Sequence, residues 1–252
     1  MITDRPVVLR MHDVTRIHGA GSTAVTAVDH VDLDVRAGEL VAVMGRSGSG
    51  KSTLLNLAGG LDQPSRGAVV VEGQDLSTCR PARLAELRRR HVGYVFQHGN
   101  LLPTLTASEN VSLPLELDGV SVREARAAAV SILSEVLHPD VVDRYPDELS
   151  GGEQQRVAVA RGLIGSRRLL LADEPTGALD EVTAEAVMRL LRDRCNDGAA
   201  ALVVTHDAAQ AAWADRVVRL RDGRIDSITG DRPASQPTIT QATDTRTAEL
   251  QR

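Results

Sequence analysis

The chain has few aromatic residues and few cysteines. Its aromatic residues are one Trp, two Tyr and one Phe among 252 residues, so Leu, Val and Ala must supply most of the buried apolar area. Two cysteines, Cys79 and Cys195, indicate neither a disulfide framework nor a cysteine-based metal site. Cys195 falls on an apolar helical face, where we expect a reduced, buried thiol.

The sequence also lacks a long apolar run and an excess of basic charge. No apolar segment approaches the length of a membrane span, and residues 1–6 do not resemble a signal sequence. The formal net charge of -5 gives the chain no general attraction to nucleic acid, and we place the basic run 88–90 on a solvated helix face. We therefore expect a cytoplasmic chain that binds no nucleic acid and meets a membrane only through a partner.

A glycine-rich segment between residues 45 and 53 has the pattern of a phosphate-binding loop. An apolar strand-like run, 40–44, precedes it and a helix-forming run, 54–58, follows it. Glycines let the backbone N–H groups turn toward a phosphate, and the helix adds its positive N-terminal end. The alternative is a simple glycine-rich turn. The predicted ATP-binding residues are Gly45, Arg46, Ser47, Gly48, Ser49, Gly50, Lys51, Ser52 and Thr53, with Lys51 on the β- and γ-phosphates and Ser52 on Mg²⁺.

The pattern of apolar and polar residues along the chain predicts an α/β fold with two added subdomains. Continuous apolar runs at 169–172 and 201–205 are typical of parallel strands covered on both faces by helices. Apolar and polar residues alternate in short stretches of 7–36, which favours an antiparallel β subdomain with one solvent-exposed face. A mostly helical insertion covers about 98–158, where Ser121 and Glu124 have the spacing of a capping box. The polar segment 229–252 is expected to be disordered.

Polar residues follow the predicted strands at their carboxyl ends, where ligands of such sheets bind. Gln97, Asp173, Glu174 and His206 should therefore meet Gly45 at one edge. Asp173 and Gln97 can ligate Mg²⁺ together with the loop hydroxyl, Glu174 is the candidate general base, and His206 can hold the γ-phosphate. Gln97 can also orient the water and report nucleotide state to the helical insertion. The alternative is a set of solvated polar strand ends.

A second unusual segment, 149–156, reads Leu-Ser-Gly-Gly-Glu-Gln-Gln-Arg. Ser150 and Glu153 have capping-box spacing, but Gly151 and Gly152 in the first helical turn cost about 1 kcal/mol each relative to Ala. We interpret this helix start as a second anion site that caps the ATP of another copy, so that two copies enclose two ATP. A glycine-loosened cap is the alternative, and it predicts no ATP-dependent dimer.

Taken together, these motifs resemble the ATP-binding subunit of an ABC transporter over about residues 5–228. The phosphate loop, Gln97, 149–156, 169–175, 178–180 and His206 match the family's Walker A, Q-loop, signature, Walker B, D-loop and switch histidine in order. The resemblance implies a P-loop NTPase (RecA-like) fold. It also implies Glu174 as the catalytic carboxylate, Asp180 at a homodimer interface, and a membrane permease against the helical insertion. His18 stands where the family usually has a Tyr that stacks on adenine.

Segments 59–64, 96–103 and 109–111 resemble the branch that serves FtsX-like permeases in lipoprotein release, macrolide or peptide export, and cell division. The resemblance implies an ATPase that drives such a permease from the inner face of the cell membrane. An ATPase of a mechanotransmitting complex that controls cell-wall hydrolysis is one alternative. Another is a soluble ABC ATPase acting on DNA or ribosomes, which usually has a long coiled coil or two cassettes. A non-hydrolysing module is disfavoured because Glu174 and His206 are both present.

Overall fold

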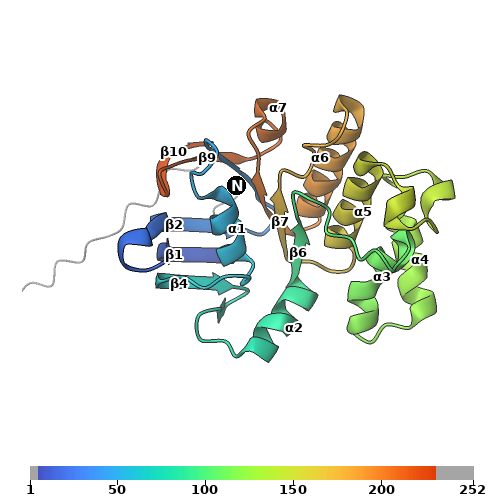
Figure 1. Cartoon of the computed structure of the whole chain (residues 1–252), viewed down its shortest axis with the longest axis horizontal. Coiled ribbons are helices and arrows are strands. Elements are labelled where there is room, and N and C mark those ends of the chain that lie inside the picture. The colour runs from blue at the N-terminus through green and yellow to red at the C-terminus, as the bar shows by residue number, and fades with distance from the viewer. Residues whose placement is uncertain (1–4, 231–252) are drawn as a thin grey trace, which may run out of the picture.

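The larger of two β-sheets forms the centre of the computed structural model, which describes residues 5–230 (Figure 1). Its strand order is β10-β9-β3-β8-β7-β6, and all strands are parallel except β10, which pairs antiparallel with β9. Their bounds are β3 (Leu40–Met44), β6 (Val92–Val95), β7 (Leu169–Asp173), β8 (Ala200–Val204), β9 (Arg216–Arg221) and β10 (Arg224–Gly230). The predicted mainly parallel core is confirmed.

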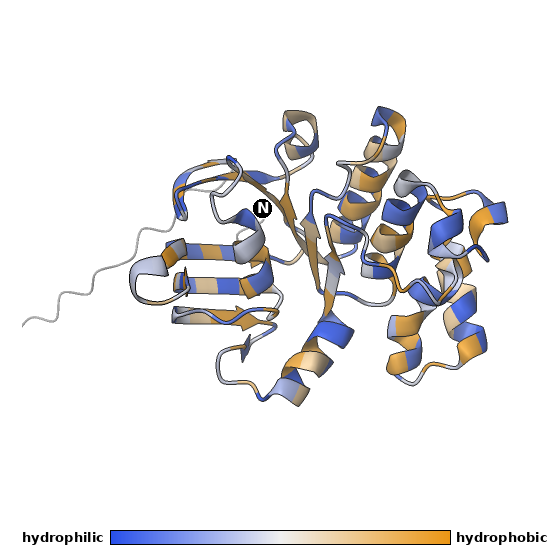
Figure 2. Ribbon diagram, in the orientation of Figure 1, coloured by the Kyte–Doolittle hydropathy of each residue, from blue (hydrophilic) through white to orange (hydrophobic). Residues whose placement is uncertain are grey.

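The central strands β3, β7 and β8 are apolar up to their carboxyl ends because each of their faces lies in a different core. In β7, Leu169 and Leu171 belong to one buried cluster, whereas Leu170 and Ala172 belong to the other. Side chains alternate between the two faces of a strand, so a strand that is covered on both faces has no position facing solvent along its covered length. Figure 2 shows these strands mostly in the colours of hydrophobic residues.

The second sheet is antiparallel and has the strand order β2-β1-β4-β5. Its strands are β1 (Val7–His18), β2 (Val25–Arg36), β4 (Arg66–Val71) and β5 (Gln74–Asp75). Buried residues such as Leu9 and Met11 alternate with exposed ones such as Arg10 and His12. The expected antiparallel sheet with one solvent-exposed face is therefore present.

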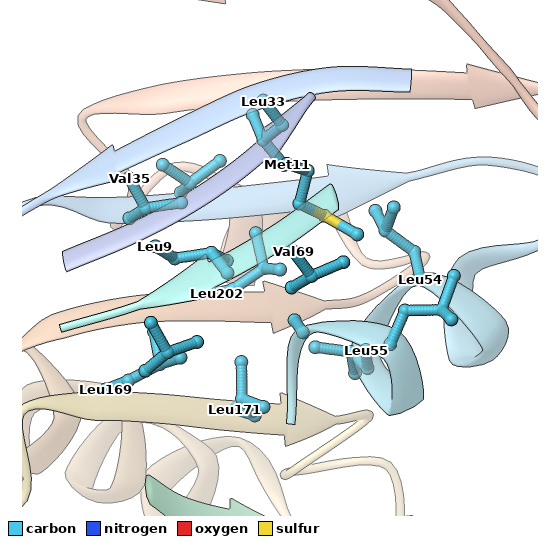
Figure 3. Close-up of a cluster of buried hydrophobic side chains, with 14 of the residues drawn as sticks. Leu9, Met11, Leu33, Val35, Leu54, Leu55, Val69, Leu169, Leu171 and Leu202 are labelled. Carbon is cyan, nitrogen blue, oxygen red and sulfur yellow. The ribbon is translucent and has the colours of Figure 1, made fainter. Parts of the chain in front are cut away.

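Helix α1 (Lys51–Ala58) lies between the two sheets and joins their cores (Figure 3). Its Leu54 and Leu55 share one buried cluster with Leu9 of β1 and Leu202 of β8. The helix that follows the phosphate loop is thus fixed by packing on both sides. A well-packed helix start positions its backbone N–H groups precisely enough to bind an anion.

The other helices cover the remaining faces of the central sheet and build a lobe beside it (Figure 1). They are α2 (Pro81–His91), α3 (Ala107–Leu117), α4 (Val122–Leu133), α5 (Gly151–Leu163), α6 (Glu181–Asn196) and α7 (Ala208–Ala211), with short 3-10 turns at Gly21–Thr23, Pro139–Val141 and Pro146–Glu148. Helices α5 and α6 pack on the sheet through the second buried cluster. Within residues 5–230, none of these helices combines the length and the apolar character that a bilayer crossing needs.

The helical lobe differs from its prediction in three details. Helix α5 continues to Leu163, past the expected boundary at 158. The apolar residues that repeat at 3.6-residue spacing between 129 and 137 predict one helix, but α4 ends at Leu133 and the buried Leu137 follows it. Ser121 caps α4 by accepting the Glu124 N–H at 3.3 Å. In a full capping box the Glu124 carboxylate would accept from the Ser121 backbone N–H. Here it accepts from the Ser121 hydroxyl instead, at 2.6 Å.

The predicted roles of the basic run and of the cysteines can be compared directly with the structure. Arg89 and Arg90 on α2 both bond to Asp118, and Arg90 also pairs with Glu86, so acidic residues of the chain itself offset part of the charge of this basic face. Cys195 is buried and free, and burial raises the pKa of its thiol to about 12. The expected disordered segment 229–252 begins too early, since residues 229–230 belong to β10, and its remainder lies outside the described residues.

Candidate active site

The phosphate loop connects β3 to α1 and depends on glycines that no other residue can replace. Gly50, the N-cap of α1, has φ 100°, and a Cβ there would lie 2.0 Å from the Ala27 carbonyl oxygen. A Cβ on Gly45 would lie 2.3 Å from the Leu220 carbonyl oxygen. The loop is therefore pressed against β2 and β9, which leaves its other side free for a ligand.

Lys51 is the first residue of α1, and its side chain folds over the loop. Its Nζ donates to the carbonyl oxygens of Gly45 at 2.9 Å and Arg46 at 2.8 Å. These contacts hold a positive charge above the N–H groups of the helix start, where both would face a phosphate. Within the same loop Arg46 is exposed and Ser49 is buried, and neither side chain lines the cavity described next.

A cavity of about 460 Å³ brings the predicted residues together. Gln97 follows β6, Asp173 ends β7, and Glu174 and His206 follow β7 and β8. The lining residues are Ala27, Gly45, Ser47, Gly48, Gly50, Lys51, Ser52, Thr53, Gln97, Asp173, Glu174, Val204 and His206. The predicted convergence at one sheet edge is thus present. Ala27 and Val204 were not predicted, because small apolar residues within strands carry no local signal of a site.

Glu174 has the most constrained conformation in this cavity. Its φ of 47° places a non-glycine residue in the left-handed region, while its N–H still donates to the Val204 carbonyl at 2.9 Å. Strained backbone that is held by surrounding structure is typical of functional sites. One carboxylate oxygen, Oε1, accepts a hydrogen bond from His206 at 2.8 Å, whereas the buried Oε2 has no partner in the described residues. That oxygen is free to accept a proton from a bound water.

The Glu174–His206 pair is asymmetric in its exposure. The side chain of Glu174 is 13% exposed and that of His206 is 75% exposed. The hydrogen bond to Glu174, followed by the charge of Glu174, raises the pKa of His206. The histidine therefore holds the Glu174 side chain through a hydrogen bond and remains able to reach a ligand from the solvent side.

The donors around the cavity suit a hard cation. Ser52 offers a hydroxyl, Asp173 a carboxylate and Gln97 an amide oxygen, and all three line the cavity. Tyr94 lies on the neighbouring strand β6, and burial, followed by the charge of Asp173, raises the pKa of its hydroxyl. In the described residues, no group of three His, Cys, Asp or Glu side chains can hold a metal alone. The set fits Mg²⁺, which usually takes one or two carboxylates together with substrate phosphates.

The predicted signature residues lie apart from this cavity, at the start of α5. The capping box is complete, because Ser150 Oγ accepts from the Glu153 N–H at 3.3 Å and Glu153 accepts from the Ser150 N–H at 2.7 Å. The hydroxyl bond from Ser150 lowers the pKa of Glu153. A Cβ on Gly151 would meet no atom of residues 5–230 within 4 Å, and one on Gly152 would first meet Leu179 at 3.5 Å. The chain's own packing therefore requires neither glycine.

Asp180 and His18 are also outside the cavity. Asp180 caps α6 by accepting the Thr183 N–H at 3.0 Å, and the bond from the Thr183 hydroxyl lowers the pKa of Asp180. His18 ends β1, where it is exposed and pairs with Val25. It does not line the cavity, so adenine stacking on His18 stays a prediction.

One edge of the parallel sheet combines a phosphate loop, a set of oxygen donors and a carboxylate–histidine pair. This combination defines the class of P-loop nucleotide hydrolases. A family model described as "ABC transporter" matches residues 28–177. The lipoprotein-releasing system ATP-binding protein LolD of Chromohalobacter salexigens is 48% identical over 87% of this chain and 93% of its own length. This chain belongs to the ABC transporter family, of which it is an ATP-binding, ATP-hydrolysing domain, as its motifs predicted.

Two further comparisons agree with this assignment. The macrolide export ATP-binding/permease protein MacB of Brucella melitensis is 46% identical over 92% of this chain but only 36% of its own length. The chain thus spans about a third of the MacB relatives that it matches. The dimeric, post-hydrolysis structure of the ATP-binding cassette MJ0796 with ADP and Pi superposes with a TM-score of 0.85 at 39% identity, covering 89% of this chain and 99% of that one.

Proposed function

We propose that this chain is a transporter ATPase that forms an ATP-dependent homodimer around two ATP molecules and drives a separate FtsX-like permease. The observation that carries the proposal is the helix start at Ser150, Gly151 and Gly152. These residues form the N-terminal end of α5, and a Cβ on Gly151 would have no atom of residues 5–230 within 4 Å. They lie outside the cavity that Lys51 and Glu174 line. A second copy that brings its ATP to this position would use both the open backbone and the positive end of α5.

The chemistry that we assign to the cavity is hydrolysis of the γ-phosphate by an activated water. Lys51 and the loop N–H groups hold the β- and γ-phosphates, as their arrangement above the α1 start supports. Glu174 acts as general base through its Oε2, which has no hydrogen-bond partner among residues 5–230, and this role is typically worth about 10²- to 10⁴-fold in rate. His206 positions Glu174 and contacts the γ-phosphate, and Gln97 orients the water.

Ser52, Asp173 and Gln97 would hold the Mg²⁺ of the nucleotide, directly or through water. When bound, the ion neutralises charge on the β- and γ-phosphates and fixes their orientation. Asp180 is assigned to the dimer interface, where its position at the exposed start of α6 supports a contact between copies.

The permease partner is proposed from two kinds of support. LolD, whose length this chain nearly matches, is named as the ATP-binding protein of a lipoprotein-releasing system, and MacB is named as a joined ATP-binding/permease protein for macrolide export. We infer a location on the inner face of the cell membrane, with residues 5–228 as the ATPase domain and the lobe built on α3 and α4 against the permease. Substrate choice would then belong to the permease, in export or in extrusion of a lipid or peptide.

The dimer is tested with Glu174→Gln, which should keep ATP binding, lose at least about 10²-fold in turnover and accumulate as an ATP-bound dimer in analytical ultracentrifugation. The matched control is the double variant Lys51→Ala, Glu174→Gln, which should remain monomeric with ATP because the phosphate-loop cation is missing. Wild-type turnover in Glu174→Gln would remove Glu174 from the mechanism. A monomer at saturating ATP would contradict the dimer.

The partner is tested by capturing tagged Glu174→Gln with ATP from native membranes in mild detergent and identifying stoichiometric partners by mass spectrometry. An integral membrane protein with few spans and a large external domain supports the FtsX-like assignment. Recovery of soluble partners only, with none of the chain on membranes, would instead favour a soluble ABC ATPase.

A further inference from the structure

Gln155 is a buried glutamine on α5 whose side-chain amide forms hydrogen bonds in three directions. The residue is 3% exposed. Its Nε2 donates to the Phe96 carbonyl at 3.4 Å and to the Pro175 carbonyl at 3.2 Å, and its Oε1 accepts from the Gly99 N–H at 3.3 Å. A buried amide is expensive to desolvate unless such partners are present, so these bonds specify one orientation of the side chain.

The three partners belong to the two loops that carry the proposed reactive groups. Phe96 and Gly99 flank Gln97, and Pro175 directly follows Glu174. One amide therefore clamps the backbone beside Gln97 to the backbone beside Glu174. The two loops follow β6 and β7, which are neighbours in the sheet.

A second side chain of α5 strengthens the connection to the Gln97 loop. The guanidinium of Arg161 donates to the Gly99 carbonyl at 2.7 Å and to the Asn100 carbonyl at 2.9 Å. The loop from Phe96 to Asn100 is thus tied to α5 at several backbone atoms. Gln155 is the one of these two residues that also reaches the loop after Glu174.

On its other side, the same loop is connected to the phosphate-loop helix by aromatic stacking. The rings of Tyr94 and Phe96, half of the aromatic residues in the chain, stack with centroids 4.2 Å apart. The Tyr94 hydroxyl donates to Asn56 of α1 at 2.8 Å. A continuous set of contacts therefore runs from α1 through Phe96 and Gln155 to the residue after Glu174.

We propose that Gln155 is a positioning residue for ATP hydrolysis, which fixes the Gln97 loop and the Glu174 loop at one spacing. The proposal deepens the function proposed above and rests on the roles given there to Gln97 and Glu174. A misplacement of about 1 Å in a reacting group can cost about 10²-fold in rate. Loss of the clamp should therefore lower kcat by about 10- to 100-fold, whereas KM for ATP should stay within about threefold because the phosphate loop is untouched.

The test compares Gln155→Met with Val157→Ala. Methionine keeps the length of the side chain but removes all three bonds. Val157 lies in the same helix and is fully buried, and its apolar side chain forms none of the three hydrogen bonds, so its truncation loosens packing but leaves the clamp in place. In Gln155→Met we expect the fall in kcat and faster hydrogen–deuterium exchange confined to residues 96–99 and 174–177. In Val157→Ala we expect a lower melting temperature with kcat within about twofold of wild type.

The outcomes separate this inference from the proposed function. If Gln155→Met keeps wild-type kcat while Glu174→Gln loses turnover, Gln155 has no positioning role and the proposed function stands. Equal losses of kcat in Gln155→Met and Val157→Ala would also overturn the inference, since general loosening would explain both. If Glu174→Gln keeps turnover, the proposed function fails instead. Should Gln155→Met not fold, Gln155→Asn replaces it, because the shorter amide cannot reach both carbonyls and should also lower kcat.

Discussion

His206 Nδ1 donates to Glu174 Oε1 at 2.8 Å, and this bond joins the ends of two neighbouring strands, β7 and β8. The pair connects a carboxylate that is almost buried to an imidazole that is mostly exposed. The second carboxylate oxygen, Oε2, is buried and has no partner within the described residues. The same side chain can therefore be held by the histidine and still act on a water.

The first prediction concerns the titration of this pair. The bond to Glu174 raises the pKa of His206, so the charged pair is complete below the ordinary histidine pKa of about 6.5 and is lost as pH rises through the higher folded value. In nucleotide-free protein, NMR titration of the His206 ring should give a pKa above the ordinary histidine value of about 6.5. In Glu174→Gln most of this upward shift in the pKa of His206 should disappear. An unshifted wild-type titration would contradict the pairing.

The second prediction tests the phosphate loop by removing its cation. Lys51→Ala should weaken ATP binding by about 10- to 100-fold, because a hydrogen bond to a charged group is worth about 1.5–3 kcal/mol. Isothermal titration calorimetry with ATP measures the change in the dissociation constant. Arg83→Ala is the control: it removes the same charge from the exposed face of α2 and should leave the affinity unchanged. Unchanged affinity in Lys51→Ala itself would contradict the loop assignment.

The sequence predicted those parts of the site that depend on short spacings. The phosphate loop and the residues at strand ends follow from local patterns, because parallel strands deliver their carboxyl ends to one edge. Long-range relationships leave no such pattern. The positive φ of Glu174, the contact of Gly50 with Ala27, and the amide of Gln155 between two loops all depend on how distant segments pack.

The third prediction concerns a buried ion pair that the sequence did not reveal. Arg216 of β9 bonds to Glu39, just before β3, at 2.9 Å, and the side chains are 7% and 3% exposed. Glu39 also accepts the Arg36 N–H at 2.8 Å. Arg216→Met should lower the free energy of unfolding by about 3–5 kcal/mol, because it leaves Glu39 charged and buried without its partner. Urea denaturation followed by circular dichroism measures the change.

A more exposed pair, which links β10 of the central sheet to β2 of the antiparallel sheet, provides the control. Arg224 of β10 bonds to Asp29 at 2.6 Å, but its side chain is 69% exposed. Arg224→Met should cost no more than about 1 kcal/mol, since solvent screens such pairs. Similar costs for the two variants would show that burial does not set the value of the Arg216–Glu39 pair.

The fourth prediction separates the stability of the single chain from the stability of the proposed dimer. Gly151 lies in the first turn of α5, its φ is not positive, and a Cβ there would meet no atom of residues 5–230 within 4 Å. Gly151→Ala should therefore leave the monomer as stable as before or stabilise it by up to about 1 kcal/mol. In the Glu174→Gln background, however, it should weaken the ATP-dependent dimer by at least about tenfold, because the methyl group would occupy the space where the partner's nucleotide approaches. Sedimentation with ATP gives the dimer constant, and ATP affinity of the monomer, expected to be unchanged, is the internal control. A dimer constant equal to that of the parent would show that the open backbone at α5 is only a loose helix cap.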